Sequence, residues 1–142
     1  MTEQIAGVSQ RFTHPRVVGR DCIDEHGHVN NEVYLRWVLD VATRASSACG
    51  WDLERYEREG TAWIVRRHEL DYLKQLHLDT EVLVHTWIET YSRITAIRVT
   101  EVCDLSGVCA FRAKTTWVHV SRKLLRPVRI PEALVTDFAR DR

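Results

Sequence analysis

The chain has 142 residues, of which 44% are hydrophobic and 28% charged, the balance of an ordinary globular protein. Its 20 basic residues equal its 20 acidic residues, which argues against a nucleic-acid partner because such binders carry a basic excess. The 6 glycines and 3 prolines are too few for a collagen-like or low-complexity chain. We therefore expect a single domain over residues 1–142, with residues 1–9 loose.

No targeting segment is visible, because the N-terminal residues lack a basic region followed by an apolar run. Wholly apolar stretches are a few residues long, far short of the ~20 residues that span a bilayer. We therefore expect a cytoplasmic protein without a membrane partner. The four cysteines have no C-x-x-C spacing and are expected to be reduced thiols, although Cys103 and Cys109 could face each other across a hairpin.

The first elements in chain order are a strand, a loop and a long helix. Residues 11–19 predict a strand whose proline suits a sheet edge, and a polar loop follows over 20–31. From Asn31 to Cys49 apolar residues recur at helical spacing in a wide stripe, which predicts a helix buried on most sides. Asn30 or Asn31 is a natural N-cap for this helix.

A short charged helix is predicted between its N-cap, Asp52, and Gly60. The chain after Gly60 has extended character, with strands expected at about 61–73, 80–90, 92–103 and 108–120. Residues Leu105 to Gly107 form the predicted hairpin turn between the last two strands. A basic, proline-bearing tail over 122–131 then leads to a final short helix over 132–140.

These elements predict the fold class. Short connections between successive strands require antiparallel neighbours. One long buried helix can cover its apolar stripe only by packing on that sheet. The sequence therefore predicts an α+β fold in which a five-stranded antiparallel sheet wraps round one long helix.

The loop before the long helix carries the chemistry. It places Asp24 seven positions before Asn31, where the helix is expected to begin. A helix start presents unpaired N–H groups and about half a positive charge. A substrate carbonyl lying between the two residues would meet an amide donor on one side and a carboxylate on the other. That geometry is typical of acyl transfer, which needs an oxyanion donor and a base or nucleophile.

The string D-x-x-G-H-V-N-N-x-x-Y, which runs from Asp24 to Tyr34 ahead of a helix and an antiparallel sheet, resembles the hotdog-fold acyl-CoA thioesterases of the 4-hydroxybenzoyl-CoA thioesterase type. Segments 63–73 and 126–131 also resemble that family, so the resemblance extends from about Val17 to Pro131. It implies that the single domain is a hotdog domain. It also implies an acyl-CoA thioesterase, which hydrolyses a thioester to a free carboxylic acid and coenzyme A.

The resemblance also implies roles for residues of the loop. Asp24 falls on the catalytic aspartate, acting as base or nucleophile, and the backbone amide near Asn31 on the group that polarises the carbonyl. Gly27 falls on the turn glycine, and we expect His28 to hold the loop by hydrogen bonding. No metal is expected, because no further histidine or cysteine is spaced to join His26 and His28 as zinc ligands.

The expected substrate-binding residues lie outside the loop. Tyr34 and Trp63 are candidates for contacts with the acyl group, although a place in the core suits either residue. Arg93 matches a position that some relatives use for nucleotide phosphates. The tail has four basic residues and no acid between 122 and 129, so Arg126 and Arg129 are further candidates for the phosphates of coenzyme A.

Two other functions stay open at this point. One is an enoyl-thioester hydratase or dehydratase on the same fold, with Asp24 and His28 as an acid–base pair. The other is an acyl-CoA-binding module without catalysis. In each case the expected partner is a thioester of coenzyme A or acyl carrier protein, and no cofactor is expected because coenzyme A is part of the substrate. An uncovered sheet face or edge predicts a homodimer or homotetramer, and in the family the site lies between two subunits.

Overall fold

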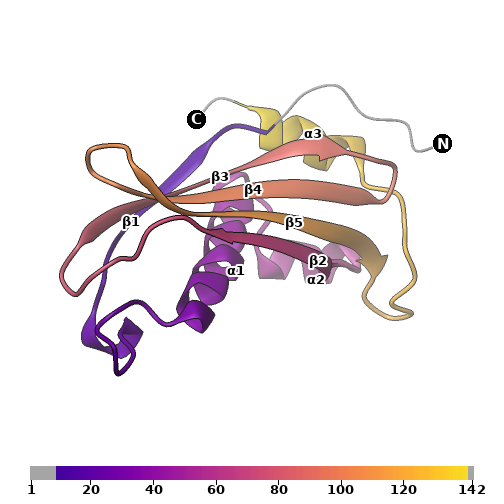
Figure 1. Cartoon of the computed structure of the whole chain (residues 1–142). Helices are drawn as coiled ribbons and strands as arrows, with labels where there is room; N and C mark the ends of the chain where they lie inside the picture. The colour runs from indigo at the N-terminus through magenta and orange to yellow at the C-terminus, as the bar shows by residue number, and fades with distance from the viewer. Residues whose placement is uncertain (1–8, 141–142) are drawn as a thin grey trace.

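The computed structural model describes residues 9–140 (Figure 1). The elements follow in the order β1 (Phe12–Val17), η1 (Arg20–Cys22), α1 (Asn31–Ala48), α2 (Leu53–Glu59), β2 (Thr61–Tyr72), β3 (Glu81–Tyr91), β4 (Thr95–Asp104), β5 (Cys109–Ser121) and α3 (Glu132–Ala139). The predicted helices and strands are all present. The prediction that residues 1–9 are loose falls outside the described residues except at Ser9. That residue is buried, and its hydroxyl accepts a hydrogen bond from the Ile88 amide at 2.6 Å.

The five strands form one antiparallel sheet in the order β1-β3-β4-β5-β2. Helix α1 lies against one face of this sheet, as Figure 1 shows. The predicted α+β architecture is therefore confirmed. β4 begins at Thr95 and not at 92, because Ser92 caps the preceding turn by accepting a hydrogen bond from the Thr95 amide at 3.0 Å.

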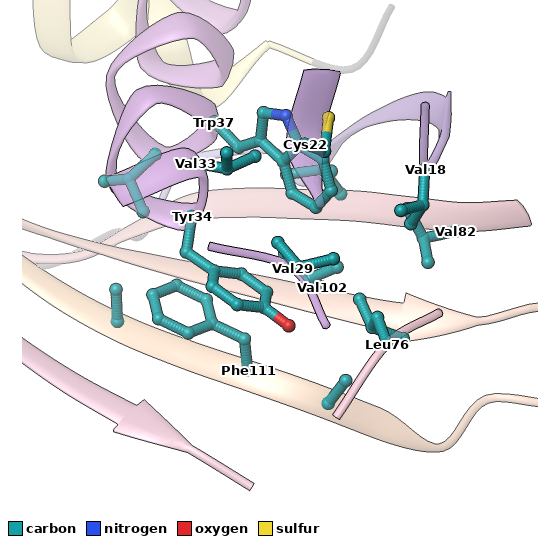
Figure 2. Close-up of a cluster of buried hydrophobic side chains, with 14 of the residues drawn as sticks. Val18, Cys22, Val29, Val33, Tyr34, Trp37, Leu76, Val82, Val102 and Phe111 are labelled. Atoms are coloured by element: carbon teal, nitrogen blue, oxygen red, sulfur yellow. The ribbon is translucent and has the colours of Figure 1, made fainter. Parts of the chain in front are cut away.

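Local sequence signals explain where α1 begins and ends. Asn30 is the N-cap, and its side-chain oxygen accepts a hydrogen bond from the Glu32 amide at 3.1 Å. Gly50 follows the helix with a φ of +88°, a conformation in which most side chains would be strained. The apolar stripe of α1 then packs on the sheet, and Tyr34 stacks on Phe111 of β5 with ring centroids 4.6 Å apart (Figure 2).

The interior contains two hydrophobic clusters. The first surrounds the N-terminal half of α1 and includes Val33, Tyr34 and Phe111 (Figure 2). The second lies at the other end of the sheet and includes Trp51, Tyr91, Ile130, Leu134 and Phe138.

Between the two clusters, buried polar side chains cross the middle strands, namely Thr86 of β3, Arg98 and Thr100 of β4, and Thr115 of β5. Arg98 and Thr100 are consecutive inward positions of β4, and they lie between the buried apolar residues Ala96 and Val102 on the same face. The core is therefore divided by a polar strip, and this strip contains a charged side chain.

Across residues 9–140, the helices are all too short or too polar to cross a lipid bilayer.

Candidate functional site

The loop that carries Asp24 folds into a small hairpin. Ile23 and Val29 form an isolated antiparallel bridge, and the Asp24 amide donates to the His28 carbonyl at 2.8 Å. The Gly27 amide donates to the Asp24 carbonyl at 3.1 Å, and Gly27 has a φ of +79°, so glycine suits this turn position. The hairpin thus returns the chain to the start of α1, with Asp24 opposite His28.

The Asp24 carboxylate is held by backbone amides. Its Oδ1 accepts hydrogen bonds from the His26 amide at 2.9 Å and the His28 amide at 3.2 Å. The hydrogen bond from His28, assisted by that from His26, lowers the pKa of Asp24 below its ordinary value. Asp24 is therefore ionised at neutral pH, and its Oδ2 accepts no hydrogen bond from the described residues.

The same turn occurs a second time, in the β4–β5 hairpin. Oδ1 of Asp104 accepts hydrogen bonds from the Ser106 amide at 2.9 Å and the Val108 amide at 3.0 Å, and Gly107 has a φ of +93°. The pKa of Asp104 is also lowered, first by the hydrogen bond from the Ser106 hydroxyl. An aspartate followed three positions later by glycine thus explains the hydrogen bonds and pKa of Asp24 without catalysis. Asp104 is consequently a natural control for Asp24.

The first turn of α1 leaves one amide without an acceptor among the described residues. The Asn30 side chain accepts from the Glu32 amide, and the Asn30 carbonyl accepts from the Val33 amide at 2.9 Å. Asn31, the first residue of the helix, makes no such bond with the part of the chain described here. Its N–H therefore lies at the positive end of the helix and can donate to an incoming oxygen.

His26 and His28, the two histidines near Asp24, have side chains that contact Glu25 and His77. The His28 ring lies against that of His77, with centroids 5.6 Å apart, and the exposed His26 lies 3.7 Å from the Glu25 carboxylate. Within residues 9–140, the group of side chains placed to hold a metal ion is Glu101 with Cys103 and Cys109, and it does not include Asp24.

Cys103 and Cys109 face each other across the β4–β5 hairpin, as their positions suggested. Both are free thiols, with their Sγ atoms 2.6 Å apart. Burial raises the pKa of Cys103 to about 12, so this thiol is protonated at neutral pH.

The two aromatic candidates have different surroundings. Tyr34 is 3% exposed and belongs to the first hydrophobic cluster, where burial raises its pKa to about 12 (Figure 2). Trp63 lines a cavity of about 250 Å³ between the C-terminal half of α1 and the sheet. The cavity is lined mainly by aromatic and small side chains, which include Ala42, Ser46, Trp51, Tyr56, Trp63, Ala96, Trp117 and Phe138, together with Ile88, Arg98 and Arg122.

The cavity and Asp24 lie at opposite ends of α1. Ala42, at the cavity wall, follows Asn31 by eleven residues, which corresponds to about 16 Å along the helix axis. Within one chain, the cavity is therefore remote from the loop that carries the predicted chemistry.

The three candidate arginines lie at the end of the sheet remote from Asp24. Arg93 is exposed in the β3–β4 turn, and its carbonyl accepts from the amide of Ile130, the neighbour of Arg129. Arg126 is exposed beside the end of β5. The loop between β1 and α1, which carries Asp24, lies at the other end (Figure 1), and the ten residues of β4 span about 33 Å.

Known proteins share both sequence and fold with this chain. The family profile described as "Acyl-ACP thioesterase N-terminal domain" matches residues 11–138. The chain belongs to this thioesterase family. Among curated relatives, the proposed acyl-CoA thioesterase YneP of Bacillus subtilis (strain 168) is 24% identical over 110 residues, which cover 78% of this chain and 80% of YneP.

Two solved structures illustrate the fold of the thioesterase. The hypothetical protein SAV2348 of Staphylococcus aureus, solved in complex with CoA, is 22% identical with a TM-score of 0.86, over 95% of this chain and 85% of that one. Slr0204, a 1,4-dihydroxy-2-naphthoyl-CoA thioesterase from Synechocystis, is 20% identical with a TM-score of 0.82, over 91% and 96% of the two chains. The predicted hotdog fold is confirmed, and the protein is a thioester hydrolase by family, which favours hydrolysis over the two alternative functions.

Sequence reasoning missed Arg98 of the thioesterase. This residue is 5% exposed, lines the cavity, and donates a hydrogen bond from Nη1 to Oγ1 of Thr86 at 3.2 Å. The sequence does contain a signal for Arg98. Every second residue of a strand lies on the same face, so Arg98 shares one face of β4 with Ala96, Thr100 and Val102. A charged residue at an inward position of a strand is unusual enough to indicate a functional or structural role.

Proposed function

We propose that the thioesterase hydrolyses an acyl thioester of coenzyme A to the free carboxylic acid and the thiol, with Asp24 as general base or nucleophile. The observation that carries this proposal is that one short segment contains both an ionised carboxylate, whose Oδ2 is unbonded among the described residues, and the unused Asn31 amide at the start of α1. YneP is named as an acyl-CoA thioesterase, and SAV2348 was solved in complex with CoA. Both findings support coenzyme A as the thiol that carries the acyl group.

The proposed chemistry needs few groups. The carbonyl oxygen accepts a hydrogen bond from the Asn31 amide, and one such donor contributes about 2.7–4 kcal/mol to transition-state stabilisation. Asp24 either takes the proton of an attacking water or attacks the carbonyl carbon, forming a mixed anhydride that water then hydrolyses. The thiol leaves as a thiolate, since its pKa of ~8.5 requires no strong general acid. The proposal includes no metal and no cofactor.

We further propose that the complete site needs two subunits. In one chain, Asp24 is remote from Trp63 and from the three candidate arginines. β2 lies at an edge of the sheet, and its pairing with the same strand of a second copy would be antiparallel about a two-fold axis. That arrangement brings the Asp24 loop of one subunit toward the sheet end at which the other subunit carries its cavity and basic tail.

A panel of acyl-CoA substrates, followed with a thiol-trapping dye, tests the activity directly. Release of thiol from at least one acyl-CoA is the expected result. Conversion of an enoyl thioester without thiol release would instead identify a hydratase, and tight acyl-CoA binding without turnover would identify a binding module.

Neutralising the basic tail is expected to weaken substrate binding without slowing the chemical step. For the double variant Arg126→Gln and Arg129→Gln, we expect KM to rise several-fold and kcat to stay nearly constant, the pattern of lost uniform binding. The effect should be larger at low salt, since exposed charges are screened by ions. Steady-state kinetics at two salt concentrations measure it.

A matched double variant, Arg11→Gln and Arg112→Gln, removes an exposed and a half-buried arginine that pair with Glu101 away from the tail. It should leave KM unchanged. An equal rise of KM in both double variants would show a general charge effect and exclude a phosphate contact by the tail.

Exhaustive chelation is expected to leave activity intact. The helix amide polarises the thioester in the proposed mechanism, so no Lewis acid is required. Turnover before and after dialysis against EDTA, with metal content determined by mass spectrometry, measures the effect. Activity that disappears with chelator and returns with zinc would contradict the mechanism and implicate His26 and His28.

A further inference from the structure

A buried arginine without an acidic partner lies at the floor of the cavity. Arg98 is 5% exposed, and Nη1 donates to the Thr86 hydroxyl at 3.2 Å. The titratable groups within electrostatic reach of its guanidinium are Tyr56, Tyr91 and Cys49, and none of these is a carboxylate. Among residues 9–140, the Arg98 charge therefore has no ion-pair partner.

Such an arrangement favours an anionic ligand. A guanidinium keeps its proton inside proteins and has five N–H donors, of which Thr86 receives one in the described structure. Burial lowers the pKa of Arg98, because the charged form has lost its water. A buried charge that lacks a partner is strongly unfavourable, so an incoming anion would be bound tightly there.

The other side chains that line the cavity indicate the chemistry of the rest of the ligand. Trp51, Trp63 and Phe138 present aromatic surface to the cavity, and Trp117 adds an indole whose Nε1 has no partner among the described residues. The volume of about 250 Å³ exceeds the roughly 150 Å³ that accommodates benzene in an engineered protein cavity. The cavity thus combines space for an apolar body with a single buried cation.

The entrance of the cavity lies at the surface. Leu53 is 64% exposed, and the Arg122 side chain is 39% exposed. A ligand that enters past these residues can reach Arg98 with its far end while its body contacts the aromatic walls. Its anionic group must be compact, and a planar carboxylate matches the planar fork of the guanidinium.

We propose that this cavity binds a small apolar carboxylic acid, with the carboxylate paired to Arg98 and the body packed against the tryptophans. The source of the carboxylate is either a free acid or the end of an acyl group remote from its thioester. The second source rests on the proposed function, whereas the site itself does not.

Binding of 3-phenylpropionate and of the uncharged 3-phenylpropanol to the whole protein tests the site, with titration calorimetry as the readout. We expect the wild-type protein to bind the acid about ten-fold or more tightly than the alcohol. The variant Arg98→Met should lose this preference and bind the alcohol as before. Equal binding of both probes by the wild-type protein, which needs no variant, would overturn the proposal.

Two variants make this test specific. Arg11→Met, which removes an exposed arginine that does not line the cavity, should keep the preference for the acid. Arg98→Met should retain or gain thermal stability, because an apolar side chain in place of a buried charge is often neutral or stabilising. A variant that unfolds more easily and loses both probes equally would show that Arg98 has a structural role, and would overturn the proposal.

Hydrolysis of glutaryl-CoA and pentanoyl-CoA distinguishes the two sources. A wild-type preference for glutaryl-CoA that disappears in Arg98→Met would assign the carboxylate to the acyl group. Equal rates with retained binding of 3-phenylpropionate would assign it to a free acid. Retained acid binding without hydrolysis of any thioester would overturn the proposed function and not the site, while hydrolysis without acid binding would overturn the site alone.

Discussion

Replacement of Asp24 by asparagine is expected to lower kcat by about 100-fold or more while leaving the fold intact. Asparagine is nearly the same size, but it cannot take a proton from water and is a poor nucleophile. Its side-chain oxygen can still accept the hydrogen bonds that the His26 and His28 amides donate to Oδ1. The loop geometry should therefore survive, and the loss should come from the chemistry. Steady-state turnover and thermal unfolding of the same preparation measure the two effects.

The repeated turn at Asp104 makes this experiment specific. Asp104→Asn alters an aspartate with the same backbone hydrogen bonds in a hairpin without a proposed role, so turnover should stay near that of the wild type. Asp24→Ala removes the turn acceptor as well as the carboxylate. If Asp24 serves only the turn, Asp24→Asn will keep normal turnover and Asp24→Ala alone will lose it. That outcome would remove Asp24 from the mechanism.

Elements whose signals are local could be predicted from the sequence. The start of α1 depends on Asn30, α2 lies between Asp52 and Gly60, and the turn between β4 and β5 depends on Asp104 and Gly107. Each signal acts within a few residues, through a cap or a left-handed glycine. The order of the strands could not be predicted in this way, because pairs such as β5 with β2 join segments that are distant in the sequence.

The same distinction applies to the site. Asp24 and Asn31 lie seven positions apart in one segment, so the motif that names both could be recognised from the sequence alone. The cavity is assembled from α1, α2, α3 and four strands, and the position of Arg98 in it depends on the register of β4 against its neighbours. Tyr34 was a candidate contact because its position fits the motif, but tight packing on Phe111 places it in the core.

The polar strip under α1 separates the two hydrophobic clusters of the core. Thr86, Thr100 and Thr115 are buried in the middle of the sheet, between a cluster that supports the Asp24 loop and a cluster that surrounds the cavity. His68 of β2 extends the strip to the sheet edge, where its Nδ1 lies 2.8 Å from the Thr115 hydroxyl. Burial lowers the pKa of His68, which favours the neutral ring at neutral pH.

The free edge of β2 is the surface that the proposed dimer would use. β1, at the other edge of the sheet, has six residues and contains Pro15, both features that discourage pairing. β2 has twelve residues, and Ile64 and Val65 are 43% and 37% exposed on it. An uncovered edge strand of this length, with exposed apolar side chains at Ile64 and Val65, is suited to pairing with a second copy of itself.

Placing lysines on this edge is therefore expected to separate the subunits and abolish most activity. In the double variant Ile64→Lys and Val65→Lys, four added charges would meet across the two-fold axis, so light scattering should show a monomer where the wild type is a dimer or tetramer. Turnover should fall about 100-fold or more, because Asp24 would lose the cavity and basic tail of the other subunit. Leu105→Lys, at a more exposed apolar position in the β4–β5 turn, should change neither mass nor turnover. A monomeric Ile64→Lys and Val65→Lys protein with full turnover would refute the shared site, since each chain would then contain all that hydrolysis requires.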